Sequence, residues 1–581
     1  MKQALLVSIT LTLLIGLFTG CTSIIGTGKW PTPRLAAPNY AILSPRGTAL
    51  PGSLELAQAN IAYVKAIEAM ERGEAGCVDL FFQAAQFCWC DIQAHALEHS
   101  NCPHELPSSP LYHSALLGLI VQGQHHNRFD PSTGLRIHTS DGWINIPCHF
   151  DGFSRGPEDI CSIVSVGDYA TSQLNNIYRQ KGLGVPAVVQ CRSSQVFQRK
   201  QSSYVATLLL RIERDSTSSG NPSFVLESIN PLVYSSVAVN EVNLPMAFDK
   251  TAAIARTLST TKRNYVKAFL QPGNVDPDEE GLFMLEPYVE GKIPVVVVHG
   301  LLSDRLTWAN LVNEIRARPW FNDRFQIWGF EYPTGKPFLP SAALLRSQLT
   351  KLCNVVDPDD KDDSLKQIVL VGHSMGGLVS KLQVSNSGDK LWNAISNRRF
   401  EDVTMLPRFR EKLAESAFFE SSSRVTRVVY IGTPHRGSAL ANRAIGRLGS
   451  LLIEQPAEVK LAHRQLIDAN PDTFSFEFTR RIPNSLDLLE PDSPLLSAIH
   501  GLPIEPQVHT HSIIGSGRWM PGNGDSDGVV PVSSAIQVTA DSEKYVGEKH
   551  ADLTRDPSTI DEVLRILREH FERPGCATTI P

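Results

Sequence analysis

The sequence predicts a mostly parallel, doubly wound α/β sheet in the C-terminal half of the chain, preceded by a separate α+β domain. In the C-terminal half, short apolar runs alternate with segments of helical periodicity, which is typical of a sheet with helices on both faces. The run Val295–Val298 contains only β-branched residues, as expected of a strand buried on both faces. A second run, Ile368–Val371, ends at a glycine and leads into a helical segment. These two runs predict neighbouring strands of one buried sheet.

Length and composition indicate a packed globular protein with more than one domain. The chain has 581 residues, of which 42% are hydrophobic and 20% are charged. Such a chain is long enough to bury two or more cores. Its formal charge of -6 is too small to indicate a nucleic-acid partner, and none is expected.

The first 21 residues have the pattern of an export signal. A short positive region at Lys2 precedes the apolar segment Ala4–Phe18, and Leu17–Cys21 resembles a bacterial lipobox, in which Cys21 is lipidated. An ordinary signal peptide cut nearby is the alternative. Both interpretations predict export, and lipidation predicts a membrane-anchored lipoprotein of the cell envelope, on the periplasmic or outer-membrane side in a Gram-negative cell. Residues 22–52, rich in Pro, Gly, Thr and Ser, are expected to be a tether.

Residues 53–280 are predicted to form the α+β domain. Helices are expected at 54–70, 77–97 and 111–121, and strands at 135–137, 187–190, 203–212 and 223–226. No catalytic constellation is visible here, and the role of the domain is not predicted. Export makes disulfides possible among its cysteines. Cys88, Cys90, Cys102 and His104 fit no zinc spacing, so no metal is expected.

Residues 281–581 are predicted to form the sheet domain, after the acidic, Pro- and Gly-containing stretch Gln271–Glu280. Strands are expected at 295–298, 325–332, 367–371, 425–431, 510–514 and 543–546, and helices at 308–316, 341–353 and 559–571. For the last helix, Thr559 and Glu562 have the spacing of a capping box.

The pentapeptide Gly372–Gly376 is a G-x-S-x-G motif between a predicted strand and a predicted helix. In a nucleophile elbow the serine sits in a sharp, strained turn, and the glycines avoid collisions with the neighbouring backbone. The turn would place the Ser374 hydroxyl clear of the sheet edge, close to the positive end of a helix. Ser374 is therefore the predicted nucleophile.

A serine hydroxyl needs a base within hydrogen-bond reach, and the base needs a carboxylate that orients it. After a nucleophile elbow, the acid and then the histidine follow along the chain. Asp525 and Asp527 both follow a predicted strand, and Asp527, directly before Gly-Val-Val-Pro, is favoured. His550 lies in a predicted loop and is the favoured base, whereas His570 lies on the last helix and is expected to be a cap or a surface residue.

The oxyanion of a tetrahedral intermediate needs two backbone N–H donors. One is expected from Met375, directly after the nucleophile, and the other from Leu301 in the loop after the first buried strand. His299 in that loop and His435, which precedes the acid, are expected to be structural.

From about Gly291 onwards the chain resembles the α/β-hydrolase-fold serine esterases and lipases. The motifs that carry this resemblance are V-V-V-V-H-G-L (295–301), V-G-H-S-M-G-G (371–377), I-G-T-P-H-R-G-S (431–438), S-D-G-V-V-P (526–531) and His550. The third motif is similar to bacterial lipases and to the deacylases of glycosylphosphatidylinositol. The resemblance covers about half of the chain. It implies a Ser374, Asp527 and His550 triad that cleaves carboxylic esters without a cofactor, and it leaves the ester or lipid substrate undefined.

Two other functions stay open on sequence grounds. With the same triad, the protein could be an acyltransferase that uses an acceptor other than water. Alternatively, an inactive hydrolase domain could serve as a scaffold while the N-terminal half binds an envelope partner.

Two insertions are expected to shape the pocket, at 386–423 and 439–508. In the second, Ile445, Leu448, Leu451 and Leu452 have amphipathic helical spacing. A movable lid and a permanently packed helical cap both explain this pattern.

Overall fold

The computed structural model describes residues 53–96, 108–153, 156–166, 171–192, 197–199, 201–213, 223–261, 263–276, 279–438 and 453–572. These residues form two compact units. One unit takes 53–261 and 316–323, and the other takes 263–315 and 324–572. The predicted signal segment, Cys21 and the tether lie outside the described residues.

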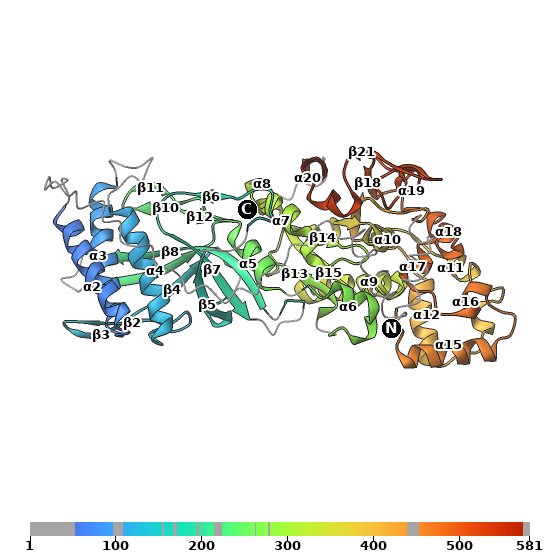
Figure 1. The fold of residues 1–581 in the computed structure, drawn as a ribbon, viewed down its shortest axis with the longest axis horizontal. Helices are drawn as coiled ribbons and strands as arrows, with labels where there is room; N and C mark the ends of the chain where they lie inside the picture. Colours follow the sequence, from blue (N-terminus) through green and yellow to red (C-terminus); the bar gives the residue numbers. More distant parts are fainter. Residues whose placement is uncertain are drawn as a thin grey trace, which may run out of the picture. The chain divides into compact units, whose positions relative to one another are not determined.

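The first unit combines helices with a five-stranded sheet (Figure 1). Its first three helices are α2 (Leu54–Glu71), α3 (Cys77–His95) and α4 (Ser109–His125). The sheet has the strand order β4 (Cys148–Asp151), β9 (Ser223–Ile229), β8 (Gln201–Glu213), β7 (Val185–Arg192) and β5 (Ile160–Ser165). The predicted helices and strands of this region are confirmed.

Smaller elements complete this unit. They are a three-stranded sheet of β1 (Phe129–Asp130), β2 (Gly134–Thr139) and β3 (Gly142–Ile146), the pairs β10 (Ser236–Val239) with β11 (Val242–Pro245) and β6 (Arg179–Gln180) with β12 (Phe248–Asp249), and helix α5 (Ala252–Thr260). Tyr112 ties α4 to β8, because its hydroxyl donates to the Leu210 carbonyl at 2.9 Å and accepts from the Leu210 N–H at 2.8 Å.

The cysteines of this unit provide no metal site in the described residues. Cys77 and Cys88 are buried in α3 with free thiols, so these two form no disulfide. Cys102 and His104 lie outside the described residues. Among the residues that are described, no group of three or more His, Cys, Asp and Glu side chains could hold a metal ion.

The second unit is built on a seven-stranded sheet. The strand order is β13 (Gly281–Met284), β15 (Phe325–Glu331), β14 (Ile293–Val298), β16 (Ile368–His373), β17 (Val425–Ile431), β18 (His509–Gly515) and β21 (Ser542–Val546). Only the edge strand β13 pairs antiparallel, and the other pairs are parallel. Every residue of β14 and β16 is buried, which explains their unbroken apolar runs. The mostly parallel α/β sheet is confirmed.

Helices follow the strands of this sheet as the alternating pattern predicts. They include α7 (Ala309–Arg316), α9 (Phe338–Val356), α10 (Met375–Lys381) and α20 (Pro557–Glu572). The predicted capping box at Thr559 is wrong. Thr559 lies inside the first turn of α20, and its N–H donates to the Asp556 carboxylate at 3.1 Å. Asp556 directly before a proline is the better start signal.

The described parts of the two insertions form one helical layer (Figure 1). The first insertion contains α11 (Lys390–Asn393) and α12 (Pro407–Ala417), and the second contains α15 (Ala457–Ala469), α16 (Phe476–Arg480), α17 (Ser485–Leu488) and α18 (Pro494–His500). Hydrogen bonds join the insertions: the Asn470 side chain accepts from the Thr404 N–H at 2.8 Å and donates to the Thr404 carbonyl at 2.7 Å. The predicted helical positions Ile445, Leu448, Leu451 and Leu452 lie outside the described residues. Movement of a lid stays a prediction.

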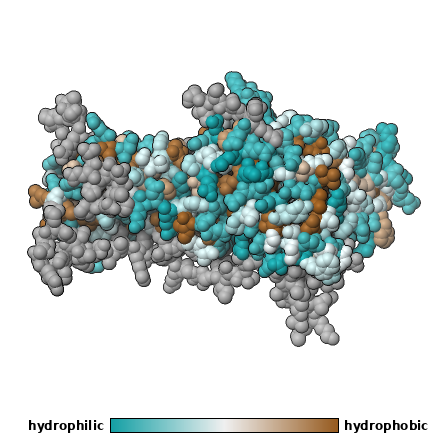
Figure 2. Space-filling model, turned by 90° about the horizontal axis from the view of Figure 1, so that it is seen from above, coloured by the Kyte–Doolittle hydropathy of each residue, from teal (hydrophilic) through white to brown (hydrophobic). Residues whose placement is uncertain are grey.

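The surface has no large apolar face in the view of Figure 2, where brown residues form small groups among hydrophilic ones. Some large apolar side chains are nevertheless exposed, among them Phe476 and Trp519. In the part of the chain that the structure describes, no helix combines the length and apolarity needed to cross a membrane.

Candidate active site

Ser374 lies in a strained turn between β16 and α10. Its backbone has φ 53° and ψ -125°, a conformation that non-glycine residues rarely adopt. Strain of this kind costs about 1–3 kcal/mol and persists only where the surroundings enforce it. Here the Ser374 N–H donates to the Ile431 carbonyl at 2.8 Å, which continues the pairing of β16 with β17. The predicted strand, turn and helix context of the pentapeptide is confirmed.

The two glycines of the pentapeptide are required by close approach of backbone atoms. A Cβ on Gly376 would lie 2.2 Å from the Val298 carbonyl oxygen, and a Cβ on Gly372 would lie 2.6 Å from the Gly376 carbonyl oxygen. Both obstacles are main-chain atoms and cannot rotate away. A side chain at either position would therefore push the elbow off the sheet.

The structure brings Ser374, His550 and Asp527 into one hydrogen-bonded chain. His550 Nδ1 donates to Asp527 Oδ2 at 2.7 Å. When Nδ1 carries the proton of the neutral ring, Nε2 is free of hydrogen and acts as an acceptor. Nε2 lies 2.9 Å from Ser374 Oγ. The side chains of His550 and Asp527 are only 2% and 1% exposed. This geometry can deprotonate the serine hydroxyl when it attacks a substrate.

Of the two candidate carboxylates, Asp527 bonds to His550 and Asp525 does not. The second oxygen of Asp527 accepts from the Val529 and Val530 N–H groups at 2.9 and 2.7 Å, so the loop orients the carboxylate. Asp525 is exposed, and its carboxylate accepts from the Gly517 and Ser526 N–H groups instead. It has a local structural role.

Of the other histidines, His570 differs from the prediction. It is buried, its Nδ1 accepts from Arg427 Nε at 3.0 Å, and its Nε2 donates to the Gln367 carbonyl at 3.1 Å. The expectation of a cap or surface residue is therefore wrong. His435 is fully buried, with its ring 4.8 Å from that of Tyr430.

The loop after β14 lies against the nucleophile. A Cβ on Gly300 would lie 2.8 Å from Ser374 Cβ, so the loop passes directly over the serine. Leu301 is buried, and Leu302 has a positive φ of 51° while its N–H donates to Thr334 Oγ1 at 3.2 Å. Met375 is the first residue of α10, where an N–H has no acceptor within the helix.

His299 shapes this loop. Its Nε2 accepts from the Tyr332 N–H at 3.3 Å, and the Tyr332 hydroxyl donates to the His299 carbonyl at 2.8 Å. The two rings stack with centroids 4.6 Å apart. Its contacts agree with the loop-shaping role predicted for it.

His373 is a site residue that the sequence analysis missed. Its Nε2 donates to the His550 carbonyl at 3.0 Å, and the two rings lie 4.8 Å apart. Burial, together with the neighbouring His550, lowers the pKa of His373 to about 3. The ring is therefore neutral at pH 7 and places no charge against the imidazolium that His550 would form. Its position directly before Ser374, on a buried strand, is the only sequence signal for this contact.

Buried neutral histidines predict that this unit loses stability in mild acid. Burial and Arg427 lower the pKa of His511 to about 4, and His373 has a pKa of about 3, whereas an unfolded histidine titrates near 6.5. Protons then bind more readily to the unfolded chain, so the free energy of unfolding falls as the pH drops below 6.5. The loss between pH 7.5 and pH 5 should be about 2 kcal/mol for each such histidine.

Urea unfolding at both pH values measures this loss. His511→Gln should have a smaller pH dependence than the unchanged protein, by about the share of one histidine. An equal dependence in both proteins would contradict the assignment to His511.

Comparison with solved structures finds lipases and esterases that match about half of this chain. Lipase BlEst2 from Bacillus licheniformis in its mature form is 17% identical, with 49% of this chain and 97% of that chain covered and a TM-score of 0.30. EstA from Clostridium botulinum is 12% identical, with 50% and 90% covered and a TM-score of 0.30. Staphylococcus hyicus lipase is 12% identical, with 49% and 97% covered and a TM-score of 0.29. No family model and no curated protein matches the chain. At these identities and TM-scores the likenesses carry no argument about the reaction.

Proposed function

We propose that this chain is a serine hydrolase that cleaves carboxylic esters through an acyl-enzyme intermediate. The observation that carries the proposal is the hydrogen-bonded chain from Ser374 Oγ through the His550 ring to Asp527. The strained turn at Ser374 supports it, because such turns are kept where function needs them. The choice of esters over other acyl compounds rests on the resemblance of the motifs.

In the proposed reaction, Ser374 Oγ attacks the ester carbonyl while His550 Nε2 takes its proton. His550 then gives this proton to the departing alcohol, and Asp527 stabilises the imidazolium in between. The N–H groups of Leu301 and Met375 hold the oxyanion, and the positive end of α10 lies on the same side. Water, deprotonated by His550, then attacks the acyl-enzyme and releases the acid. No step in this scheme needs a cofactor.

The proposed location is the cell envelope, with a lipid on Cys21 holding the enzyme at a membrane. The basis for it is the lipobox-like sequence alone. Mass spectrometry of the protein purified from membranes tests it, because a diacylglyceryl-modified Cys21 would be the new N-terminus.

Covalent labelling tests the activated serine directly. A fluorophosphonate probe should attach to Ser374 in the folded protein, because its phosphorus is attacked by a serine whose proton is taken by a neighbouring histidine. Peptide mass mapping locates the label. His550→Ala should lose at least about 100-fold in labelling rate, the range that one general base supplies.

The buried serine Ser380, in helix α10 directly after Ser374, is an internal control. Its hydroxyl donates to the Gly376 carbonyl at 2.8 Å, so it should carry no label. Label on other serines but not on Ser374, in protein shown to be folded, would refute the proposed function.

A further inference from the structure

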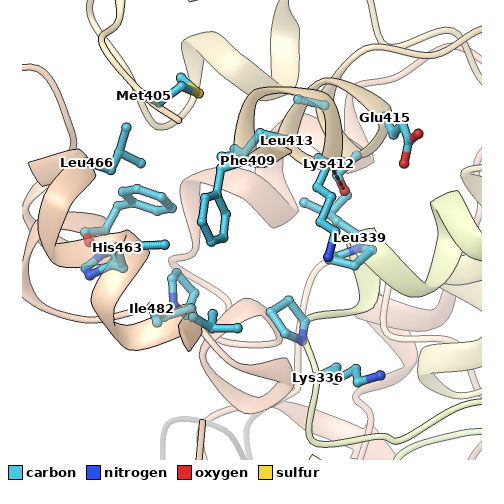
Figure 3. Close-up of a pocket in the computed structure, with 18 of the residues that line it drawn as sticks. Lys336, Leu339, Met405, Phe409, Lys412, Leu413, Glu415, His463, Leu466 and Ile482 are labelled. Carbon is cyan, nitrogen blue, oxygen red and sulfur yellow. Dashed lines mark hydrogen bonds between the residues drawn. The ribbon is translucent and has the colours of Figure 1, made fainter. Parts of the chain in front are cut away.

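A large cavity lies within the second unit between α9, α12 and α15 (Figure 3). Its volume is about 800 Å³. The walls are mostly apolar: Leu339 and Leu344 come from α9, Phe409 and Leu413 from α12, and Leu466 and Ile482 from the second insertion. Ligand pockets of proteins usually hold about 300–1,000 Å³, so this cavity has the size of a small-molecule site.

The charged and titratable groups around the cavity are few. Lys336 is already paired with Glu280, since its Nζ lies 2.7 Å from Glu280 Oε2. His463 contacts the Phe478 carbonyl at 2.7 Å through Nε2. In Figure 3, Lys412 extends toward Leu339, whereas the Glu415 carboxylate points away from it. Lys412 is exposed and makes no ion pair with the described residues, so its ammonium can meet an anion at the rim.

The cavity is separate from the catalytic groups. None of Ser374, Asp527 and His550 lines it. Leu488 of α17 and Leu495 of α18 line the cavity, and the Leu489 carbonyl between them accepts from the Ser438 N–H at 3.0 Å. An occupant of the cavity would therefore be lined by none of the three catalytic side chains.

Helix α17 is connected to the loop over the nucleophile. Ser485 Oγ donates to the Thr334 carbonyl, and Thr334 Oγ1 accepts from the Leu302 N–H at 3.2 Å. The cavity and the Leu301–Leu302 loop are thus joined through one short segment of chain.

We propose that this cavity binds one free long-chain carboxylate, with the hydrocarbon chain between α9, α12 and α15 and the carboxylate at Lys412. Apolar walls suit a hydrocarbon chain, because such a chain has no polar groups that need hydrogen-bond partners. A single cation at the rim suits a single anionic head group. Long-chain carboxylates are also the products that the proposed function would release from lipid esters. Binding itself does not depend on that reaction.

Calorimetric titration of the full-length protein with sodium palmitate, below its aggregation concentration, tests the proposal. Saturable binding of one molecule per chain is expected. Across the C10 to C16 carboxylates, each added methylene should lower the dissociation constant by about threefold to fourfold. Absence of saturable binding, or no dependence on chain length, would overturn the proposal.

Substitutions in the walls locate the bound chain. Leu413→Trp on α12 and Ala462→Phe on α15 fill the cavity from different sides, and each should weaken palmitate binding by at least about tenfold. The matched control is Leu461→Trp, because Leu461 lies beside Ala462 but is 57% exposed and outside the cavity. Circular dichroism confirms that the variants are folded. Unchanged binding in both filled variants would place the ligand elsewhere and refute the site.

The head group is tested by Lys412→Gln, which should weaken palmitate binding about threefold to tenfold and leave binding of dodecanol unchanged. Lys460→Gln, an exposed lysine on α15 outside the cavity, is the control. Equal palmitate affinity in Lys412→Gln would refute the assignment of the carboxylate to Lys412.

Separation from the catalytic groups is tested on protein labelled at Ser374 with a dodecyl fluorophosphonate. Palmitate should bind the labelled protein with unchanged affinity. Loss of binding would mean that the cavity holds the chain attached to Ser374, and it would overturn a separate site. If no label attaches, the proposed function fails, while palmitate binding to the unlabelled protein still decides the present inference.

Discussion

Ser374→Ala is expected to lower kcat for a carboxylic ester by about 10⁵- to 10⁶-fold. The change removes the hydroxyl oxygen that lies 2.9 Å from His550 Nε2. The residual rate would come from the oxyanion donors and from substrate binding. Hydrolysis of p-nitrophenyl butyrate, followed with purified protein at pH 7.5, measures the loss.

The control for this experiment is Ser380→Ala. Ser380 is a fully buried serine of α10, and its hydroxyl donates to the Gly376 carbonyl. Removal of this hydroxyl in Ser380→Ala should leave kcat within about threefold of the value for the unchanged protein. It should lower the free energy of unfolding by about 1 kcal/mol. Ester turnover that survives in Ser374→Ala would exclude Ser374 as the nucleophile, provided that peptide mapping shows the substitution to be present in the purified protein.

The strands of the second unit could be predicted because burial on both faces leaves a clear signal in the sequence. Every residue of β14 and β16 is buried, so the polar residues that interrupt a half-exposed strand are missing. The grouping of Ser374, Asp527 and His550 could be predicted for a related reason. Parallel strands end at one edge of the sheet, so loops far apart in the chain meet there.

Contacts between side chains distant in sequence were harder to predict. The bond from His373 to the His550 carbonyl spans 177 residues, and it forms only because the end of β16 meets the segment that contains His550. The burial of His570 did have a signal, however. It lies three residues after Leu567 on the apolar face of α20, so helical periodicity predicts burial even for a histidine.

The cavity could not be predicted from either insertion alone. Its walls come from α9 and from the two insertions, and strand β17 lies between the insertions in the sequence. Helix α9 and each insertion contribute an apolar helix face. An amphipathic helix indicates that one face is covered but does not identify the covering element. In this chain the facing helices leave a space of about 800 Å³ between them.

For the acid of the triad the sequence left two candidates only two positions apart, and Asp527→Asn against Asp525→Asn separates them. Asp527→Asn is expected to lower kcat by about 10³- to 10⁴-fold. An amide at this position cannot hold the His550 Nδ1 proton in the orientation that the 2.7 Å bond now enforces, nor stabilise the imidazolium. The backbone bonds from Val529 and Val530 can persist to the amide oxygen, so the loop and the stability should change little.

Asp525→Asn should leave kcat within about threefold, because the amide oxygen can still accept from the Gly517 and Ser526 N–H groups. The two substitutions lie two positions apart and make the same chemical change. General effects of the lost charge therefore cancel when their kcat values are compared. Equal losses of kcat would show that the charge of the loop, rather than its contact with His550, supports the reaction. A large loss in Asp525→Asn alone would reverse the assignment and require the loop to rearrange around the bound ester.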